Sequence, residues 1–304
     1  MYLGYPVISL SLLDKDVRPF RDLVGNPDEV SAILQQNLRD LKSVLEWNES
    51  VGVKFYRLSN TLAHRNIEAL PEAEKILEMI SEIGNYARAN GHRLSFHCSH
   101  YAVLCSPKSH VRAGARAEIE AQSKFFDLLG YEATHWNKIN IHIGGAYGNK
   151  ADSLEKWIAS WEKLSESAKK RLVVENDDRA SLYSVQDLYE GLHQKIGVPI
   201  TFDSFHHNFC NSGESKAEAA EIAASTWKGV DPCFHFASSR NLNEQKSLQT
   251  AHADWVYEDI LNWNTNAWVM VESGARDLAV LRYLKEGVQS PFAEKIILET
   301  VQDL

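Results

Sequence analysis

Short apolar segments alternate with longer amphipathic segments along the whole chain. Several of the short segments are near-continuous runs of branched and aromatic residues, which is typical of strands buried on both faces of a parallel sheet. We predict strands at 2–10, 53–58, 93–97, 137–142, 171–175, 199–203, 233–237 and 267–272.

The segments between these strands carry apolar residues at helical spacing. We predict helices near 27–51, 71–90, 112–129, 152–167, 184–194, 214–226, 252–263, 276–287 and 291–303. Start signals support several of them. Asn26 is a capping residue followed by Pro27 at the first helical position, and Ser153 and Ser184 are further predicted caps.

Eight strand–helix units in strict alternation predict an α/β fold, a closed (β/α)8 barrel of the TIM type that forms a single domain over 1–304. A length of 304 residues with 44% hydrophobic residues fits one large core. A doubly wound open sheet is the alternative, but such a sheet does not need eight units.

Composition narrows the class of protein. No apolar run reaches the roughly 18 residues of a membrane helix, and the first residues, MYLGYPVISLSL, predict a strand and not a secretion signal. Cys98, Cys105, Cys210 and Cys233 form no CxxC pair, so we expect no disulfide framework or structural zinc site and a cytoplasmic location, nucleoid-associated if the source is prokaryotic. We also expect a monomer. The net charge of −9 argues mildly against a nucleic-acid partner, unless several divalent cations bind.

Side chains that ligate metals stand at the ends of six successive predicted strands. They are His97, His142, Glu175, Asp203, His235 and Glu272, and His206 follows Asp203 closely. In a barrel these strand ends converge on one mouth. Buried acids and imidazoles need partners, and divalent ions satisfy such a mixed set of donors most simply. We therefore predict two or three ions, of the Zn, Mn or Fe type rather than Ca or Cu(I).

The remaining histidines are weaker candidates. We interpret His92, His110, His135 and His193 as ordinary residues of strand starts, loops and helices. His207 adjoins His206 and is expected to orient it. For His64 and His252, contact with metal or substrate and a purely structural role both stay open.

The chain resembles the UV damage endonuclease family, from Gly4-Tyr5-Pro6 to Val271-Glu272. The matching segments are NLRDL (37–41), YRLS (56–59), RLSFH (93–97), HIGGAYG (142–148), ENDDR (175–179), DSFHH (203–207), HFAS (235–238) and VMVE (269–272). The wider relatives of that family are endonuclease IV-type enzymes and xylose isomerase-like barrels.

The resemblance implies a DNA-repair enzyme that cuts the phosphodiester 5′ to a UV photoproduct. Abasic sites and other lesions are candidate further substrates. It implies divalent ions, commonly Mn2+, with Zn2+ or Mg2+ as alternatives, held by the strand-end ligands. Within that set we assign catalysis to Glu175, Glu272 and His235, and we add His64 as a further ligand.

The resemblance also implies residues that probe damaged double-stranded DNA. The family has a Gln-Tyr pair shortly after the strand-three histidine, where this chain has His100 and Tyr101. Tyr5 corresponds to a first-strand tyrosine near the DNA. The alternative is that these tyrosines are core or rim aromatics.

A further departure is Cys233, where the family has a lysine close to the metals. We favour a small buried residue over a thiolate ligand there. A sugar isomerase or epimerase on the same barrel is the rival function. A basic rim near the mouth is predicted from Lys108, Arg112, Arg116, Lys150, Arg179 and Arg240.

Overall fold

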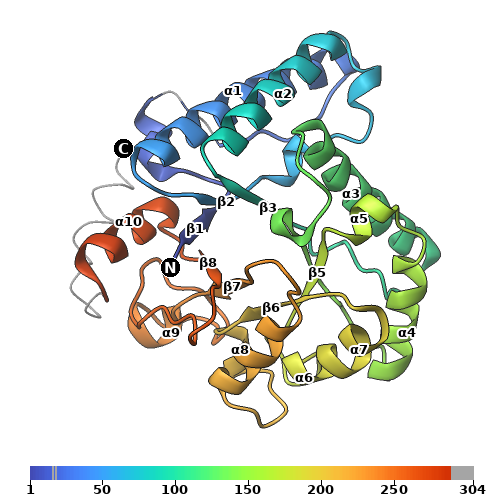
Figure 1. Cartoon of the computed structure of the whole chain (residues 1–304), viewed down its shortest axis with the longest axis vertical. Helices are drawn as coiled ribbons and strands as arrows, with labels where there is room; N and C mark the ends of the chain where they lie inside the picture. Colours follow the sequence, from blue (N-terminus) through green and yellow to red (C-terminus); the bar gives the residue numbers. More distant parts are fainter. Residues whose placement is uncertain (16, 18, 289–304) are drawn as a thin grey trace.

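The computed structural model describes residues 1–15, 17 and 19–288. Eight parallel strands pair in sequence order and close into a barrel (Figure 1). They are β1 (Leu3–Pro6), β2 (Phe55–Arg57), β3 (Arg93–His97), β4 (Ile139–His142), β5 (Leu172–Glu175), β6 (Ile200–Asp203), β7 (Cys233–Phe236) and β8 (Trp268–Val271). The predicted barrel is confirmed, and the open sheet is excluded because β8 pairs with β1.

Helices follow the strands and surround the barrel (Figure 1). They are α1 (Pro27–Ser50), α2 (Ala73–Ala89), α3 (Ser109–Leu128), α4 (Lys150–Trp161), α5 (Glu166–Lys169), α6 (Val185–Leu188), α7 (Gln194–Ile196), α8 (Lys216–Ser225), α9 (Arg240–Asn243) and α10 (Arg276–Glu286). The side chain of Asn26 caps α1 and that of Ser184 caps α6, as predicted. Ser153 instead lies inside α4, whose cap is Asn149.

Helix α1 shows how the amphipathic pattern becomes a packed layer. Leu34, Leu38, Leu41 and Leu45 recur at helical spacing and are all buried against the barrel. Burying one such side chain contributes about 1.5–3 kcal/mol relative to leaving it exposed. The outer helices therefore hold the strands, and with them the strand ends, in place.

The prediction of a helix at 252–263 is wrong. This segment is irregular and belongs to the long connection between β7 and β8. Ser239 and His252 form an antiparallel bridge, and the amide of Trp255 donates to the Glu244 carboxylate at 3.1 Å. Tertiary contacts thus take backbone groups that a helix would satisfy internally, and the buried Trp255 accounts for part of the helix-like apolar spacing.

The first strand is shorter than predicted because the chain turns at its mouth end. Val7 has a φ of 63°, which a β-branched residue adopts only under constraint. Its N–H donates to the Arg57 carbonyl at 2.9 Å, and its own carbonyl accepts from the Tyr56 hydroxyl at 2.5 Å. The short 3-10 helix η1 (Leu10–Lys15) follows.

Other boundaries also differ from the prediction. The predicted helix 152–167 is divided into α4 and α5, and 184–194 contains the π-helical turn η5 (Tyr189–His193) between α6 and α7. The predicted helix 291–303 lies outside the described residues.

The N-terminal end of the barrel is filled by a buried arginine among aromatic rings. Arg93, at the start of β3, is 0% exposed. Its guanidinium lies 4.4 Å from the ring centroid of Trp136 and 5.5 Å from that of Trp268. It also donates to the carbonyls of Trp136 and Asp231 at 2.9 and 2.8 Å. Cation–π contacts and hydrogen bonds together satisfy the buried charge.

Two helical glycines provide a matched test of how closely the outer helices pack. A Cβ added to Gly84 in α2 would lie 2.0 Å from the Leu129 carbonyl oxygen, whereas one added to Gly114 in α3 would meet nothing within 4 Å. We expect Gly84→Ala to lower the free energy of unfolding by about 1–3 kcal/mol. Gly114→Ala should raise it by about 0.5–1 kcal/mol, because alanine is the better helix former. Urea unfolding followed by circular dichroism measures both, and equal effects would contradict the close approach of α2 to the end of α3.

Candidate metal centre

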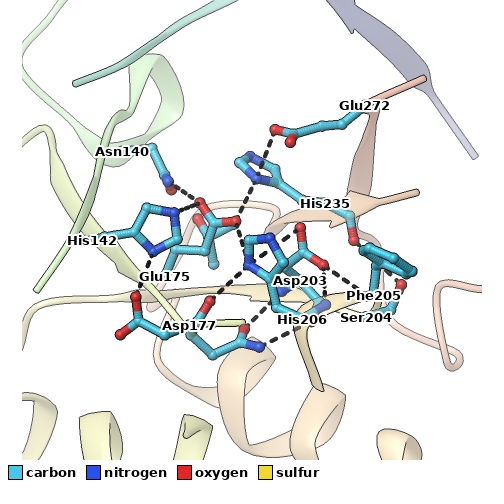
Figure 2. Close-up of polar contacts among 12 residues, drawn as sticks. Asn140, His142, Glu175, Asp177, Asp203, Ser204, Phe205, His206, His235 and Glu272 are labelled. Carbon is cyan, nitrogen blue, oxygen red and sulfur yellow. Dashed lines mark hydrogen bonds and ion pairs between the residues drawn. The ribbon is translucent and has the colours of Figure 1, made fainter. Parts of the chain in front are cut away.

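The predicted metal ligands of the strand ends meet at the C-terminal mouth of the barrel. His97 ends β3, His142 ends β4, Glu175 ends β5, Asp203 ends β6, His206 begins the 3-10 helix η6 (His206–Asn208), His235 lies in β7 and Glu272 follows β8. Figure 2 shows the side chains from β4 to β8 turned toward one another. The barrel therefore brings together residues that are far apart in sequence.

Glu175 lies at the centre of this cluster and is 1% exposed. Its Oε1 is 3.0 Å from His235 Nδ1 and 3.5 Å from His206 Nδ1, and its Oε2 is 3.1 Å from His97 Nε2 and 3.7 Å from His142 Nε2. Burial by itself would raise the pKa of this carboxyl. The imidazoles of His235 and His142 outweigh burial and hold the pKa of Glu175 well below its ordinary value.

Asp203 carries a buried oxygen with no hydrogen-bond donor in the structure. Its Oδ1 accepts from the amides of Phe205 and His206 at 2.7 and 2.8 Å (Figure 2). Its Oδ2 is buried without a hydrogen-bond partner. An unsatisfied carboxylate oxygen in the protein interior is costly, and a bound cation would remove that cost.

The donor atoms are close enough to share ions. In each of three groups they all lie within 4.8 Å of one another: His97, His142 and Glu175; Glu175, Asp203 and His206; Asp203, His235 and Glu272. Glu175 and Asp203 each belong to two groups. Nitrogen and carboxylate oxygen donors in this mixture suit Zn, Mn or Fe, so the residues present fit the predicted centre.

Within the cluster, the pKa values of two histidines are shifted in opposite directions. Burial lowers the pKa of His97 to about 4, and the nearby Glu175 only partly opposes this. Burial would lower the pKa of His142 too, but the carboxylates of Glu175 and Asp177 raise it to about 9. Asp177 Oδ1 lies 3.2 Å from His142 Nδ1 and fixes the orientation of that ring (Figure 2).

Two residues that were not predicted from the sequence, Lys138 and Asn140, hold the central groups from the barrel interior. Asn140 donates to the Glu175 carboxylate. Lys138 is fully buried, with its Nζ 2.8 Å from His235 Nε2 and donating to Asn140 Oδ1 at 3.0 Å. Burial lowers the pKa of Lys138 to about 8. A signal was available, since Lys138, Asn140 and His142 alternate with isoleucines and must face one side of the strand.

Arg57 and His252 complete the centre on the β8 side. Arg57, at the end of β2, forms an ion pair with Glu272, and both side chains are largely buried. His252 Nδ1 lies 3.0 Å from the backbone carbonyl of Glu272, and its ring is 5.3 Å from that of Phe205. Of the two histidines left open by the sequence, His252 is therefore the one at the centre.

His64 is not among the grouped donors, and the prediction that it is a ligand is not supported. Its Nδ1 accepts from the Asn66 amide at 3.2 Å, and it lines a separate, shallow pocket of about 370 Å3 with Asn60 and Arg65. His64 is not among the residues that line the cavity at the mouth of the barrel. His207 also differs from expectation, because its Nε2 contacts the Glu214 carbonyl at 3.0 Å rather than His206.

Tyr5 belongs to the core and not to the DNA-facing surface expected for it. It is 0% exposed, and its hydroxyl donates to Asn48 Oδ1 at 2.8 Å. Since β1 is covered by α1 and the neighbouring strands, the ring reaches no surface. Tyr101, in contrast, is 87% exposed, and His100 beside it is exposed too.

Cys233 packs as a small buried residue, as expected. It lies in an apolar cluster with Phe55, Trp227 and Trp268, and burial raises the pKa of its thiol. It is not among the grouped metal donors of the described residues.

The centre opens into a cavity of about 830 Å3. Its wall includes Arg57, Ser59, Asn60, His100, Arg179 and His252. His92, His110, His135 and His193, expected to be ordinary residues, are not part of this wall in the described chain.

Several cations of the predicted basic rim are bonded to other groups of the protein. Arg240 forms an ion pair with Asp254, and Lys150 lies 2.6 Å from Asp187. Arg112 donates to backbone carbonyls beside its own helix. Arg179 lines the cavity with a side chain that is 75% exposed, so it is the rim cation best placed to meet a ligand.

None of the helices in the described part of the chain combines the length and the apolar character that crossing a membrane requires.

Comparisons with known proteins agree with the sequence resemblance. The family described as UV-endonuclease UvdE matches residues 21–297. The UV DNA damage endonuclease of Bacillus cereus (strain G9842) is 28% identical over 275 residues, which cover 85% of this chain and 83% of that protein.

Solved structures give the same picture. The crystal structure of SacUVDE superposes with a TM-score of 0.83 at 26% identity and covers 100% of both chains. D-psicose 3-epimerase from Clostridium cellulolyticum H10 superposes with a TM-score of 0.54 at 17% identity, over 77% of this chain and 80% of that one. The second likeness concerns the barrel fold alone.

The environment of His142 generates a test that needs no bound metal. We expect Asp177→Asn to lower the pKa of His142 from about 9 by about one unit or more, because it removes a negative charge beside the ring. Asp178→Asn is the matched control, since Asp178 also lines the cavity but pairs with Arg179. NMR titration of the imidazole in chelator-treated protein measures the pKa. Equal shifts in both variants would mean that the Asp177 contact does not control His142.

Proposed function

This chain belongs to the UV-endonuclease UvdE family, and on that premise we propose that it hydrolyses the phosphodiester 5′ to UV photoproducts in double-stranded DNA, using two or three divalent ions. The observation that carries the proposal is the sharing of Glu175 and Asp203 among three donor groups at the mouth of the barrel. Shared carboxylates are suited to holding neighbouring ions at one phosphate. Membership of this family favours an endonuclease over the sugar isomerase alternative.

The ions would be held by the three donor groups at the strand ends, with Mn2+ as the first candidate and Zn2+ or Mg2+ as alternatives. When bound, divalent ions supply an activated water and stabilise the charge that develops on the scissile phosphate and the leaving oxygen. Glu175, Glu272 and His235 are the proposed catalytic residues, because they come together at the centre.

The protein's own side chains have two further tasks. Arg57 and Arg179 line the cavity as cations, and we assign them to phosphate oxygens of the bound strand. Lys138 and Asn140 hold His235 and Glu175 in fixed positions from below. Such support matters because small displacements of catalytic groups cost large factors in rate.

Recognition of the lesion is assigned to His100 and Tyr101. A side chain that is 87% exposed, like Tyr101, gains little from packing within its own protein. An aromatic ring at the rim of a DNA-binding cavity can replace stacking that a photoproduct has already weakened. Because Tyr5 is buried, we leave it out of this role.

The proposed activity is tested directly on supercoiled plasmid. We expect nicking of UV-irradiated plasmid and not of intact plasmid, loss of nicking after chelation and dialysis, and recovery with Mn2+. Mapping of the new ends should place each cut 5′ to a photoproduct. Glu175→Gln should reduce cleavage by about 100-fold or more, with a much smaller effect on binding. Full nicking by the metal-free protein, or equal nicking of intact plasmid, would refute the proposal.

The recognition role is tested by comparing two exposed tyrosines. Tyr101 lies at the mouth, whereas Tyr2 is 52% exposed at the other end of the barrel and stacks on Trp268 at 4.1 Å. We expect Tyr101→Ala to reduce the preference for irradiated over intact duplex roughly tenfold, the scale of base–aromatic stacking. Cutting at an abasic site should slow less, and Tyr2→Ala should leave the preference unchanged. Similar losses on both substrates would assign Tyr101 a structural role.

A further inference from the structure

The segment that carries His100 and Tyr101 is fastened to α3 by one carboxylate. The backbone amide of Ser99 donates to Glu118 Oε1 at 2.6 Å, and the Ser99 hydroxyl donates to Glu118 Oε2 at 2.7 Å. Both bonds are short and end on an ionised acceptor, which makes them stronger than bonds between neutral groups. Glu118 is half-buried, so water competes only partly for its oxygens.

A neighbouring glutamine extends this attachment to the loop after β2. Gln122 is buried, and its Nε2 donates to Asn60 Oδ1 at 3.1 Å and to Glu118 Oε1 at 3.4 Å. The thiol of Cys98 donates to Gln122 Oε1 at 3.5 Å. Asn60 and Ser99 both line the mouth cavity. Helix α3 therefore ties two loops of the mouth together through two adjacent turns of one helix face.

Beyond Tyr101 the segment is held by packing, since Ala102 is 4% exposed and Leu104 is 0% exposed, so the exposed pair lies between this packed stretch and the Ser99 anchor. The amide of Ala102 donates to the Ser99 carbonyl at 3.0 Å, and that of Val103 donates to the Tyr101 carbonyl at 3.0 Å, so the chain makes a tight turn. Tyr101 is 87% exposed and is not held by packing. Ser99 is therefore the flank of this turn that is held by side-chain hydrogen bonds, and releasing it would free the N-terminal side of the His100–Tyr101 pair.

We propose that Glu118 is a positioning residue for damage recognition. Its carboxylate fixes Ser99 so that His100 and Tyr101 meet the DNA in one prepared arrangement, and this sets the discrimination between damaged and intact duplex. A recognition group that must first be ordered by the ligand binds more weakly than one already in place. The inference rests on the proposed function and adds a residue that lies outside the grouped metal donors.

The same helix offers a matched control. Glu120 accepts from the amide and the hydroxyl of Ser165, both at 2.7 Å. Ser165 caps α5, in the connection that leads into β5 at the far end of the barrel. Glu118→Ala and Glu120→Ala therefore remove equivalent pairs of bonds, one at the mouth and one away from it.

A conservative variant separates hydrogen bonding from charge. In Glu118→Gln the amide oxygen can accept from the Ser99 amide, while the amide nitrogen donates to the Ser99 hydroxyl. If Glu118 acted through its charge on DNA, glutamine would behave like alanine. If it acts through the two bonds, glutamine should restore the wild-type preference.

The experiment measures two quantities on each full-length variant: amide hydrogen exchange of residues 99–103, and the ratio of cutting on irradiated and intact duplex. We expect Glu118→Ala to accelerate exchange in this segment and to lower the ratio roughly tenfold. Glu118→Gln and Glu120→Ala should stay near the wild-type ratio. Ser99→Ala keeps the bond from the Ser99 amide to Glu118 but removes the one from the hydroxyl, so it should lower the cutting ratio by an intermediate amount. This variant also provides the test if Glu118→Ala folds poorly.

Three results would overturn the inference. These are an unchanged ratio in Glu118→Ala despite faster exchange, unchanged exchange in that variant, or an equal loss of discrimination in Glu120→Ala. Failure of the proposed function looks different, because the wild-type protein itself would then not distinguish irradiated from intact duplex.

Discussion

The carboxylate of Glu175 meets four histidine side chains at the mouth of the barrel, and the arrangement of the strand ends depends on this contact. A carboxylate with 1% exposure is tolerated only when charged or hydrogen-bonding groups surround it. The rings of His97, His142 and His235 come from three other strands, and that of His206 from the turn after a fourth. Without Glu175, these rings would face one another with no common acceptor. The buried carboxylate of Glu175 is therefore the common partner that holds the four histidine rings together.

Positive groups around this anion come from the protein itself. Lys138 reaches His235 from below, and Arg57 pairs with Glu272 from the side. These cations share the carboxylate-rich mouth with the imidazoles, so the excess of negative charge is reduced within the cluster. Asp203 Oδ2 is nevertheless buried without a hydrogen-bond partner, and unsatisfied polar atoms of this kind are expected at functional sites.

The sequence allowed the barrel and the strand-end ligands to be predicted because both rest on local patterns. Apolar runs alternate with amphipathic segments, and a polar residue at the end of a buried strand can point only toward the mouth. His64 was misplaced because it lies in a loop, whose path the apolar pattern does not determine. Tyr5 was misjudged because family likeness at β1 does not reveal that α1 covers the ring. The irregular course of 252–263 depends on contacts with Glu244, which no local pattern encodes.

Lys138 and Asn140 were missed for a different reason. Their alternation with Ile139 and Ile141 was visible in the sequence, but an inward-facing polar residue in the middle of a strand has many roles. Only the barrel shows that Lys138 reaches a histidine from another strand. The ligands could thus be predicted from position along the strand, whereas their supports required the packing of one strand against another.

The arginine-filled floor of the barrel limits how a long polymer can use the mouth. Because Arg93 and its aromatic neighbours occupy the opposite end, the cavity is a blind pocket and not a tunnel. A strand cannot thread through it, so an internal stretch of a polymer reaches the centre only by bending or by everting a short portion into the pocket. A polymer that bends easily at that point would therefore reach the centre more readily than a stiff one. After a cut, both ends would have to leave through the same opening by which the intact strand entered.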